Sequence, residues 1–451
     1  MTDGLPPRLE RRLGVGAATV ANVLAMIGVG PFITIPLLLQ SMQGPQAMLG
    51  WVIGAVIAIC DGMVWAELGA ALPESGGGYH YVQQGYGPAR LGRLMSFLYL
   101  WQVVIVSPLI LASGAVGFSG YAQYLYPGLT HACSMLLAAG VCLLAMLLIY
   151  RRIDTVGRLG VAFGLVILAA GLWIIADGAL HARAGNLNIP PDAFRLSSTF
   201  WVGLGGATLY ATYDYTGYQT VCWLGAEVST PHVTIPRSIT VAIVLVALLY
   251  LAMNISIIAV MPWQEAMHSK FVVSDLIRRV HGPRFAALMT VLILVITFAG
   301  LFAGMLGASR VPYAAAAGGH FFSRFARLHP TGRFPSFSVL YVGVASAVCC
   351  LLSLDELIRA GTVISVIIQS LTVLGALAIL RRRRHRTHWP FRMWLYPLPL
   401  LVAMGGWVFI LGTSGTSYLL IGLAVVLIGI AAYLWQAKQK SAWPWVSAAA
   451  Q

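Results

Sequence analysis

Apolar and polar residues occur in long alternating blocks along this chain, and the apolar blocks set the expected architecture. Runs of about 18 to 25 mostly apolar residues recur from end to end, which is the length a helix needs to cross a hydrocarbon layer about 30 Å thick. Strands of a membrane barrel would be shorter and would alternate apolar with polar positions. The pattern predicts an all-α polytopic membrane protein with 12 transmembrane helices, near 14–40, 47–70, 91–125, 131–150, 158–177, 200–226, 239–261, 285–308, 337–354, 362–380, 395–413 and 418–436.

The first and sixth predicted helices contain residues that interrupt a helix. The stretch IGVGPFITIP places Gly28, Gly30 and Pro31 inside 14–40, and an unbroken helix of that length would measure about 40 Å. Glycine lets the backbone unwind, and proline fits the first turn of a new helix but has no amide hydrogen. The sixth helix, with the sequence GGATLYATYDYTGYQTVCW, carries a comparable cluster of Gly205, Gly206, Asp214, Thr216 and Gly217.

Two interrupted helices predict a five-plus-five inverted repeat. Backbone freed from helical hydrogen bonds is stable at membrane depth only where it faces protein or a watery cavity, so the breaks are expected to enclose a binding site. The alternative is that both are packing kinks. The predicted organisation is a cytoplasmic N-terminus at 1–13, a transporter core at 14–380 with repeats at about 14–177 and 200–380, a basic cytoplasmic loop at 381–394, two accessory transmembrane helices at 395–436 and a cytoplasmic tail at 437–451.

Composition and charge agree with a membrane location. Charged residues make up only 9% of the chain and hydrophobic residues 59%, whereas a soluble domain is about 25% charged. The net charge is +14, but 21 of the 28 Lys and Arg fall on the N-terminal side of the membrane if each apolar run crosses once. This is the positive-inside distribution. We therefore expect a multi-pass protein of the cell (cytoplasmic) membrane, with both termini in the cytoplasm and no nucleic-acid partner.

Few acidic residues lie in the predicted helices, where each needs a partner, a proton or a cation. Asp214, among three tyrosines, is the candidate contact for a cationic group; its alternative role is to cap the second half-helix. Asp61 is either a protonatable or cation-binding group near the cavity or a hydrogen-bonded packing residue. Glu67 and Glu227 lie near cytoplasmic helix ends, where a salt bridge or gate is favoured over substrate contact.

Catalytic and metal-binding patterns are absent from the sequence. The histidines form no pair such as HExxH, the six cysteines form no CxxC, and neither a catalytic triad nor a phosphate loop is present. We expect no enzyme activity, no metal site and no cofactor. A channel would need a continuous polar pore, and spans this apolar do not provide one.

Four motifs resemble the amino acid, polyamine and organocation (APC) transporter superfamily along nearly the whole chain. IGVGPF resembles its break in the first helix, AELGAALPESGGGY its motif after the second, GAEVSTPHVTIPRSI the end of the sixth, and SRVPYAAAAGGHFFSRFARLHP the loop after the eighth. The resemblance implies a secondary active transporter that works by alternating access, with its substrate at the two breaks. The matching substrate-site residues are Gly28, Val29, Gly30, Pro31 and Phe32 together with Asp214, Tyr215, Thr216, Gly217 and Tyr218.

Two branches of the superfamily share these features. Its amino-acid carriers hold the substrate carboxylate on the amides of the glycine motif, but here Val29 replaces a usual serine and Pro31 removes one donor. GPF at the break, Asp61 and Asp214 resemble the polyamine-proton symporters, whereas FLYLWQVVIVSP and PESGGGY resemble the L-type amino-acid branch. We expect an amino-acid permease, with proton-coupled uptake of a polyamine or other cationic amine as the alternative; a pure exchanger or a transport-dead sensor is a weaker alternative.

The resemblance also bears on the coupling ion. Residues 298–308 lack the hydroxyls of a sodium site, and the fifth predicted helix lacks the lysine that some proton-coupled relatives place there. We expect coupling to protons through Asp61 or Asp214, or plain exchange, and sodium is less favoured. The expected partners are a small amino acid or amine and the lipid bilayer, and the sequence leaves the oligomeric state undetermined.

Overall fold

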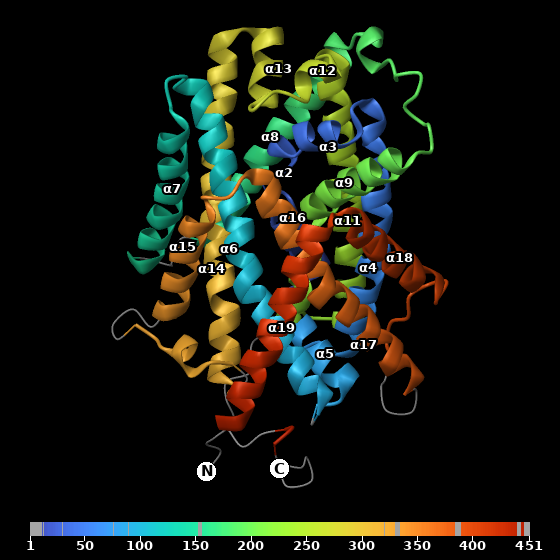
Figure 1. The fold of residues 1–451 in the computed structure, drawn as a ribbon, viewed down its shortest axis with the longest axis vertical. Coiled ribbons are helices and arrows are strands. Elements are labelled where there is room, and N and C mark those ends of the chain that lie inside the picture. Colours follow the sequence, from blue (N-terminus) through green and yellow to red (C-terminus); the bar gives the residue numbers. More distant parts are fainter. Residues whose placement is uncertain are drawn as a thin grey trace.

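The structure is a computed structural model that describes residues 11, 13–28, 30–74, 76–88, 90–151, 156–319, 321–329, 334–383, 389–439 and 443–445. Within these ranges the regular structure is helical apart from one parallel bridge between Leu13 and Val228. Among the same residues, eight helical segments are long and apolar enough to cross a membrane, and three further apolar helices are shorter. The described residues thus form a helical bundle (Figure 1), and the lengths and compositions of its helices are those of a multi-pass membrane protein.

The first predicted helix is interrupted at its glycines and proline. Helix α1 (Val15–Met26) ends just before Gly28, whose N–H donates to the carbonyl of Met26 over 3.1 Å. The chain becomes helical again in α2 (Gly30–Ile33), and α3 (Ile35–Met42) follows directly. Val29, which the sequence placed in the substrate site, lies outside the described residues.

The sixth predicted helix is also interrupted. Helix α9 (Ser198–Tyr215) begins after Ser197, whose hydroxyl accepts a hydrogen bond from the N–H of Phe200 at 3.2 Å and so caps the helix. The chain then turns through Gly217, whose φ of 129° is a conformation that glycine adopts readily and other residues rarely do. The short helices α10 (Thr220–Trp223) and η3 (Gly225–Glu227) complete this segment.

Long helices cover the predicted spans between the two breaks and the two spans that follow the second break. Two of their boundaries differ from the prediction. α11 begins at Pro231 rather than near 239, because proline fits a first helical turn. α14 continues to Ala317 rather than ending near 308. The set consists of η1 (Pro45–Ala47) followed by α4 (Met48–Ala71), α6 (Leu91–Leu125), α7 (His131–Arg151), α8 (Val156–His181), α11 (Pro231–Val260) and α14 (Pro283–Ala317).

The tenth predicted helix begins about eight residues earlier than the sequence indicated. α16 starts at Leu354 instead of near 362, because the side chains of Ser353 and Glu356 each accept the main-chain N–H of the other and form a capping box. The elements of the C-terminal part are α15 (Ser336–Cys349), α16 (Leu354–Ser365), the π-helical turn η5 (Val366–Ser370), α17 (Leu371–Arg382), α18 (Leu398–Thr413) and α19 (Thr416–Gln439).

Short helices lie in the connections between the predicted membrane helices. They are α5 (Gly78–Tyr86), η2 (Ala184–Leu187), α12 (Trp263–Ala266), α13 (Val272–His281) and η4 (Ser323–Ala326). Figure 1 shows α5 at one end of the bundle, the near end, and α12 and α13 at the other, the far end. α3 contacts the far end: the side-chain amide of Gln40 donates at 2.5 Å to the carbonyl of Met267, which directly follows α12.

Small residues let the membrane helices α4 and α9 pack closely. A Cβ at Gly50 would lie 2.6 Å from the Cβ of Ala207, and one at Gly54 would lie 2.9 Å from the Cβ of Ala211. Lipid tails are as apolar as a helix surface, so close packing of this kind replaces the hydrophobic effect as the force between membrane helices. Large apolar side chains such as Leu248, 63% exposed, lie on the outside of the bundle.

Candidate functional site

Asp214 lies in the last turn of α9, and its carboxyl group packs against the start of α2. The hydroxyl of Thr34 donates a 2.5 Å hydrogen bond to Oδ2. A Cβ at Gly30 would lie only 1.9 Å from Oδ1, so position 30 accommodates glycine alone unless Asp214 moves. The structure thus brings together two predicted site residues, Gly30 and Asp214, and adds Thr34, which sequence reasoning missed.

The carboxyl group of Asp214 is incompletely satisfied. The residue is 3% exposed, and its Oδ1 has no hydrogen-bond partner among the described residues. A buried carboxylate with an unpartnered oxygen is unfavourable unless a proton or cation joins it. A proton or an ammonium group would supply the missing partner, so this position suits an amine-bearing ligand.

Tyrosines from two other helices hold both ends of the first break. The hydroxyl of Tyr250 donates to the carbonyl of Met26 at 2.9 Å, at the end of α1. That of Tyr121 donates to the carbonyl of Phe32 at 2.7 Å, in α2. Carbonyls near a helix break lose intrahelical partners, so these bonds stabilise the interrupted backbone.

The second break lies against α1. A Cβ at Gly217 would be 2.7 Å from the carbonyl carbon and oxygen of Ala25, so the two backbones are in contact. Beyond the turn, the N–H of Val221 donates to Oδ1 of Asn22 at 2.9 Å. The last turn of α9 contacts α2, and the segment that follows α9 contacts α1. The two helix interruptions therefore lie next to each other.

The other predicted site residues differ in what they contact. Gly28 is half-buried, Pro31 and Phe32 are buried in α2, and Thr216 is exposed. The ring of Tyr215 lies edge-on to Trp51, and its hydroxyl donates to the carbonyl of Trp51 at 3.2 Å. The Tyr215 hydroxyl is therefore used by the protein itself, and so is that of Tyr218, which bonds to Asp61.

Asp61 connects three elements. Its Oδ2 accepts a hydrogen bond from the hydroxyl of Tyr218 at 2.6 Å, and its Oδ1 accepts one from the indole N–H of Trp407 at 3.1 Å. α4, the second break and α18 are joined by this carboxylate, which is 1% exposed. Of the two predicted roles, these contacts belong to the packing role, and the proton or cation role stays a prediction.

Glu67 forms the salt bridge that its position predicted. The Arg381 guanidinium donates to both carboxylate oxygens, at 2.6 and 2.7 Å, and the N–H of Met393 donates at 2.9 Å. Arg381 also stacks 3.9 Å above the ring of Tyr396. These contacts tie α4 to α17 and to the segment before α18. Glu227 accepts a main-chain bond from Leu13 through its carbonyl, and its predicted salt bridge stays a prediction.

Comparison with known proteins identifies the family of this chain. The family model described as amino acid permease matches residues 13–447. Asc-type amino acid transporter 1 of Mus musculus is 29% identical over 96% of this chain and 83% of its own length. Large neutral amino acids transporter small subunit 2 of Homo sapiens is 28% identical, over 96% and 82%. The serine/threonine exchanger SteT of Bacillus subtilis (strain 168) is 24% identical, over 96% and 98%. The superfamily resemblance of the motifs is confirmed, and this chain belongs to the amino acid permease family.

Proposed function

We propose that this protein is a secondary active transporter that moves amino acids across the cell membrane by alternating access. The observation that carries the proposal is the meeting of Asp214, Thr34 and Gly30 where two interrupted helices adjoin. A buried carboxylate with a free oxygen at membrane depth is the kind of group that marks a substrate or ion path. The relatives named above are amino acid transporters, which supports amino acids as the substrate class.

The proposal includes the topology expected from the sequence. Twelve crossings would place both termini on the cytoplasmic side, with inverted repeats at about 14–177 and 200–380 and accessory helices at 395–436. The positive-inside distribution supports this orientation. In this arrangement the near end of the bundle faces the cytoplasm and the far end faces outside.

A zwitterionic amino acid fits the site best in one orientation. Its ammonium group bonds to Oδ1 of Asp214, and its carboxylate lies toward the main-chain amides at the first break. The reverse orientation would place two carboxylates about 4 Å apart, which costs about 4 kcal/mol at the effective dielectric of a protein site. Because Oδ1 of Asp214 has no partner among the described residues while both oxygens of Asp61 are bonded, we place the coupling proton on Asp214, where it alternates with the substrate ammonium.

A carrier of polyamines or other cationic amines is the second candidate. The same free oxygen of Asp214 favours it, because any ammonium group can donate to that oxygen. The two candidates differ in the carboxylate of the substrate, which a polyamine lacks.

Uptake into proteoliposomes tests both candidates. The labelled panel is L-alanine, L-serine, L-leucine, L-glutamate, L-lysine, putrescine and spermidine, each with an imposed proton gradient, an imposed sodium gradient, or unlabelled compound inside. We expect uptake of amino acids that responds to the proton gradient or to the internal amino acid, with no response to sodium. Uptake of putrescine and spermidine alone would establish the second candidate. Folded protein that moves none of the panel would contradict the transport function.

A further inference from the structure

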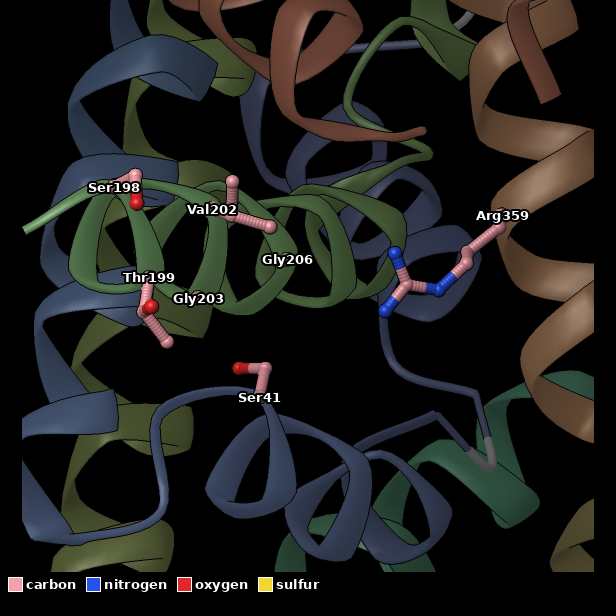
Figure 2. A pocket seen from close by; sticks show the side chains of 7 residues that line it. All are labelled: Ser41, Ser198, Thr199, Val202, Gly203, Gly206 and Arg359. Atoms are coloured by element: carbon pink, nitrogen blue, oxygen red, sulfur yellow. The ribbon is translucent and has the colours of Figure 1, made fainter. Parts of the chain in front are cut away.

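A cavity of about 340 Å³ lies at the start of α9, away from the helix breaks (Figure 2). The guanidinium of Arg359 is the charged group in its lining, and the rest is small, hydroxylated or apolar: Ser41, Ser198, Thr199, Val202, Gly203 and Gly206. The cavity lies between α3, α9 and α16 and within the size range of small-ligand sites, about 300–1,000 Å³. None of these residues belongs to the site at Asp214.

Arg359 extends from α16 toward α9 with much of its hydrogen-bonding capacity unused. Its Nε donates to Oδ1 of Asp355 at 2.7 Å, and its Nη2 donates to the hydroxyl of Tyr210 at 2.8 Å. A guanidinium has five N–H groups, and the other three have no protein acceptor in the part of the chain that the structure describes. The cavity is therefore lined by a cation with donors to spare.

Two glycines of α9 line the cavity, and one of them lies beside this guanidinium. A Cβ at Gly206 would lie 3.6 Å from Nη2 of Arg359 and 3.3 Å from the Cβ of Ser41. A side chain at Gly203 would meet the carbonyl of Ser41 at 2.5 Å. Gly206 therefore leaves the guanidinium uncovered by a side chain of α9, whereas Gly203 lets α9 contact the backbone of α3 at the edge of the cavity (Figure 2).

The cavity and the candidate substrate site lie along one face of α9. Gly206, Tyr210 and Asp214 follow one another at intervals of four residues, which places them on the same side of the helix. The rise of a helix puts Gly206 about 12 Å from Asp214. Tyr210, which also donates to Asp355, lies between them. The first interrupted helix also contributes to the substrate site and to the cavity. Thr34 contacts Asp214, and Ser41, two turns further along α3, lines the cavity.

We propose that this cavity is a second site, on the far side of the substrate site, that binds the carboxylate of a zwitterionic α-amino acid through Arg359. It rests on the proposed function, since it lies where substrate would enter from the far end. A guanidinium matches a carboxylate in geometry and charge, and the N–H groups of Arg359 that have no protein acceptor among the described residues supply the donors. Asp355, 39% exposed beside the guanidinium, receives the ammonium group. A partly exposed ion pair stabilises a protein little. The ligand can therefore replace the contact between Arg359 and Asp355 at a small cost in stability.

Chemical modification of Arg359 tests the site without relying on transport. Purified protein is treated with phenylglyoxal, which reacts with arginine, and the modified fraction of Arg359 is read by peptide mass spectrometry. We expect L-serine and acetate to slow modification of Arg359 several-fold more than chloride or ethylamine does at equal ionic strength. Arg279, a 35% exposed arginine on α13 that pairs with Glu265, is the internal control and should react equally under all conditions.

The outcomes distinguish a carboxylate site from a general anion site and from a cavity that binds neither. Equal protection by chloride would show a site for any small anion and would overturn the carboxylate assignment. Equal protection by ethylamine, or none by L-serine, would overturn the site itself. Protection of Arg359 in a protein that transports no amino acid would contradict the proposed function but support the site at Arg359. Amino acid uptake by a protein whose Arg359 is not protected would support the proposed function and overturn the site.

Transport kinetics add a second measurement. For the amino acid that the uptake panel identifies, Arg359→Gln should raise KM for entry from the far end about tenfold or more, since hydrogen bonds to charged groups are lost. Thr199→Phe fills the cavity but leaves Arg359 with its two partners, so it gives the same KM effect even if Arg359→Gln fails to fold. Arg279→Gln removes one charge from the same end and should leave KM unchanged. An unchanged KM in folded Thr199→Phe would overturn the proposal.

Discussion

The hydroxyl of Thr34 donates a hydrogen bond to a carboxylate oxygen of Asp214 at 2.5 Å, across 180 positions of sequence. Thr34 joins α2 to α3, and Asp214 lies in the last turn of α9. The bond therefore connects two interrupted helices close to where each is interrupted. It also leaves the second oxygen of Asp214 unpartnered beside Gly30, and that oxygen is where the proposed function places the substrate amine.

Gly30→Ala should reduce transport and stability together. The new methyl group would lie 1.9 Å from Oδ1 of Asp214, so the carboxyl group must move away from the break. Overpacking of this kind costs about 1–3 kcal/mol. Thermal unfolding in detergent and uptake into proteoliposomes measure the two effects. Gly16→Ala, in α1 with open space around it, is the matched control. Wild-type uptake by Gly30→Ala would show that the contact with Asp214 is unimportant.

Asp214→Asn should lower kcat/KM for substrate about 10- to 100-fold. The amide keeps an oxygen that can accept from Thr34, but it loses the charge that pairs with an ammonium group, and hydrogen bonds to charged groups are worth about 1.5–3 kcal/mol. Uptake at several substrate concentrations measures the effect. Asp192→Asn, in an exposed loop, should behave as wild type. If Asp214 only caps a helix, stability will fall while selectivity between neutral and basic amino acids stays the same.

Gly217→Ala should lower the stability of the fold by more than the strain of its backbone conformation alone would. A backbone conformation that is essentially restricted to glycine costs another residue about 1–3 kcal/mol, and here the methyl group would also meet the α1 backbone at 2.7 Å. Gly415→Ala isolates the first effect, because Gly415 has a φ of 95° and its nearest neighbour is 4.0 Å away. The yield of monodisperse protein and its unfolding temperature measure the difference. Equal losses in the two variants would mean that α1 moves freely away from the second break.

Breaking the salt bridge between Glu67 and Arg381 should cost about 3–5 kcal/mol, because removal of one partner leaves a buried charge unpaired. Glu67→Gln and Arg381→Gln test this by thermal unfolding, and the double variant should recover part of the loss. The exposed pair of Glu265 and Arg279 is the control, and Glu265→Gln should cost only about 0–1 kcal/mol. Similar losses of stability at both pairs would contradict the claim that the buried pair of Glu67 and Arg381 stabilises the fold more than the exposed pair does.

Trp407→Phe should lower stability and leave coupling unchanged if Asp61 is a packing residue. The variant removes one of the two donors to the Asp61 carboxylate, and an unsatisfied buried acceptor costs about 1–3 kcal/mol. Tyr218→Phe removes the other donor, and the double variant should lose more than the two single variants together. Unfolding temperature and uptake under a proton gradient are compared for all three. A change in the proton dependence would return Asp61 to the coupling role.

The sequence predicted the elements that depend on local pattern. Long apolar runs located the membrane helices, and the interruptions at Gly28 and Gly217 were visible because glycine and proline act on their own backbone. The early start of α16 was missed although Ser353 and Glu356 carry a readable capping signal, since the apolar run begins several residues later.

The sequence did not predict side-chain partners across the bundle. Thr34 meets Asp214 over 180 positions and Tyr210 meets Arg359 over 149. Each residue looks ordinary beside its own neighbours, and only packing of separate helices gives it a role. Asp214 was recognised as a candidate because a carboxylate inside an apolar run is costly wherever its partner lies.

A cryo-electron microscopy structure of the protein in lipid nanodiscs, with a saturating amino acid chosen from the uptake panel, addresses the central claim directly. The proposal predicts ligand density between the two helix breaks, with the ammonium group within hydrogen-bond distance of Oδ1 of Asp214 and the carboxylate near the main chain after Gly28. Density elsewhere in the bundle with this site empty, or a first helix that runs unbroken through Gly28 and Gly30, would contradict it.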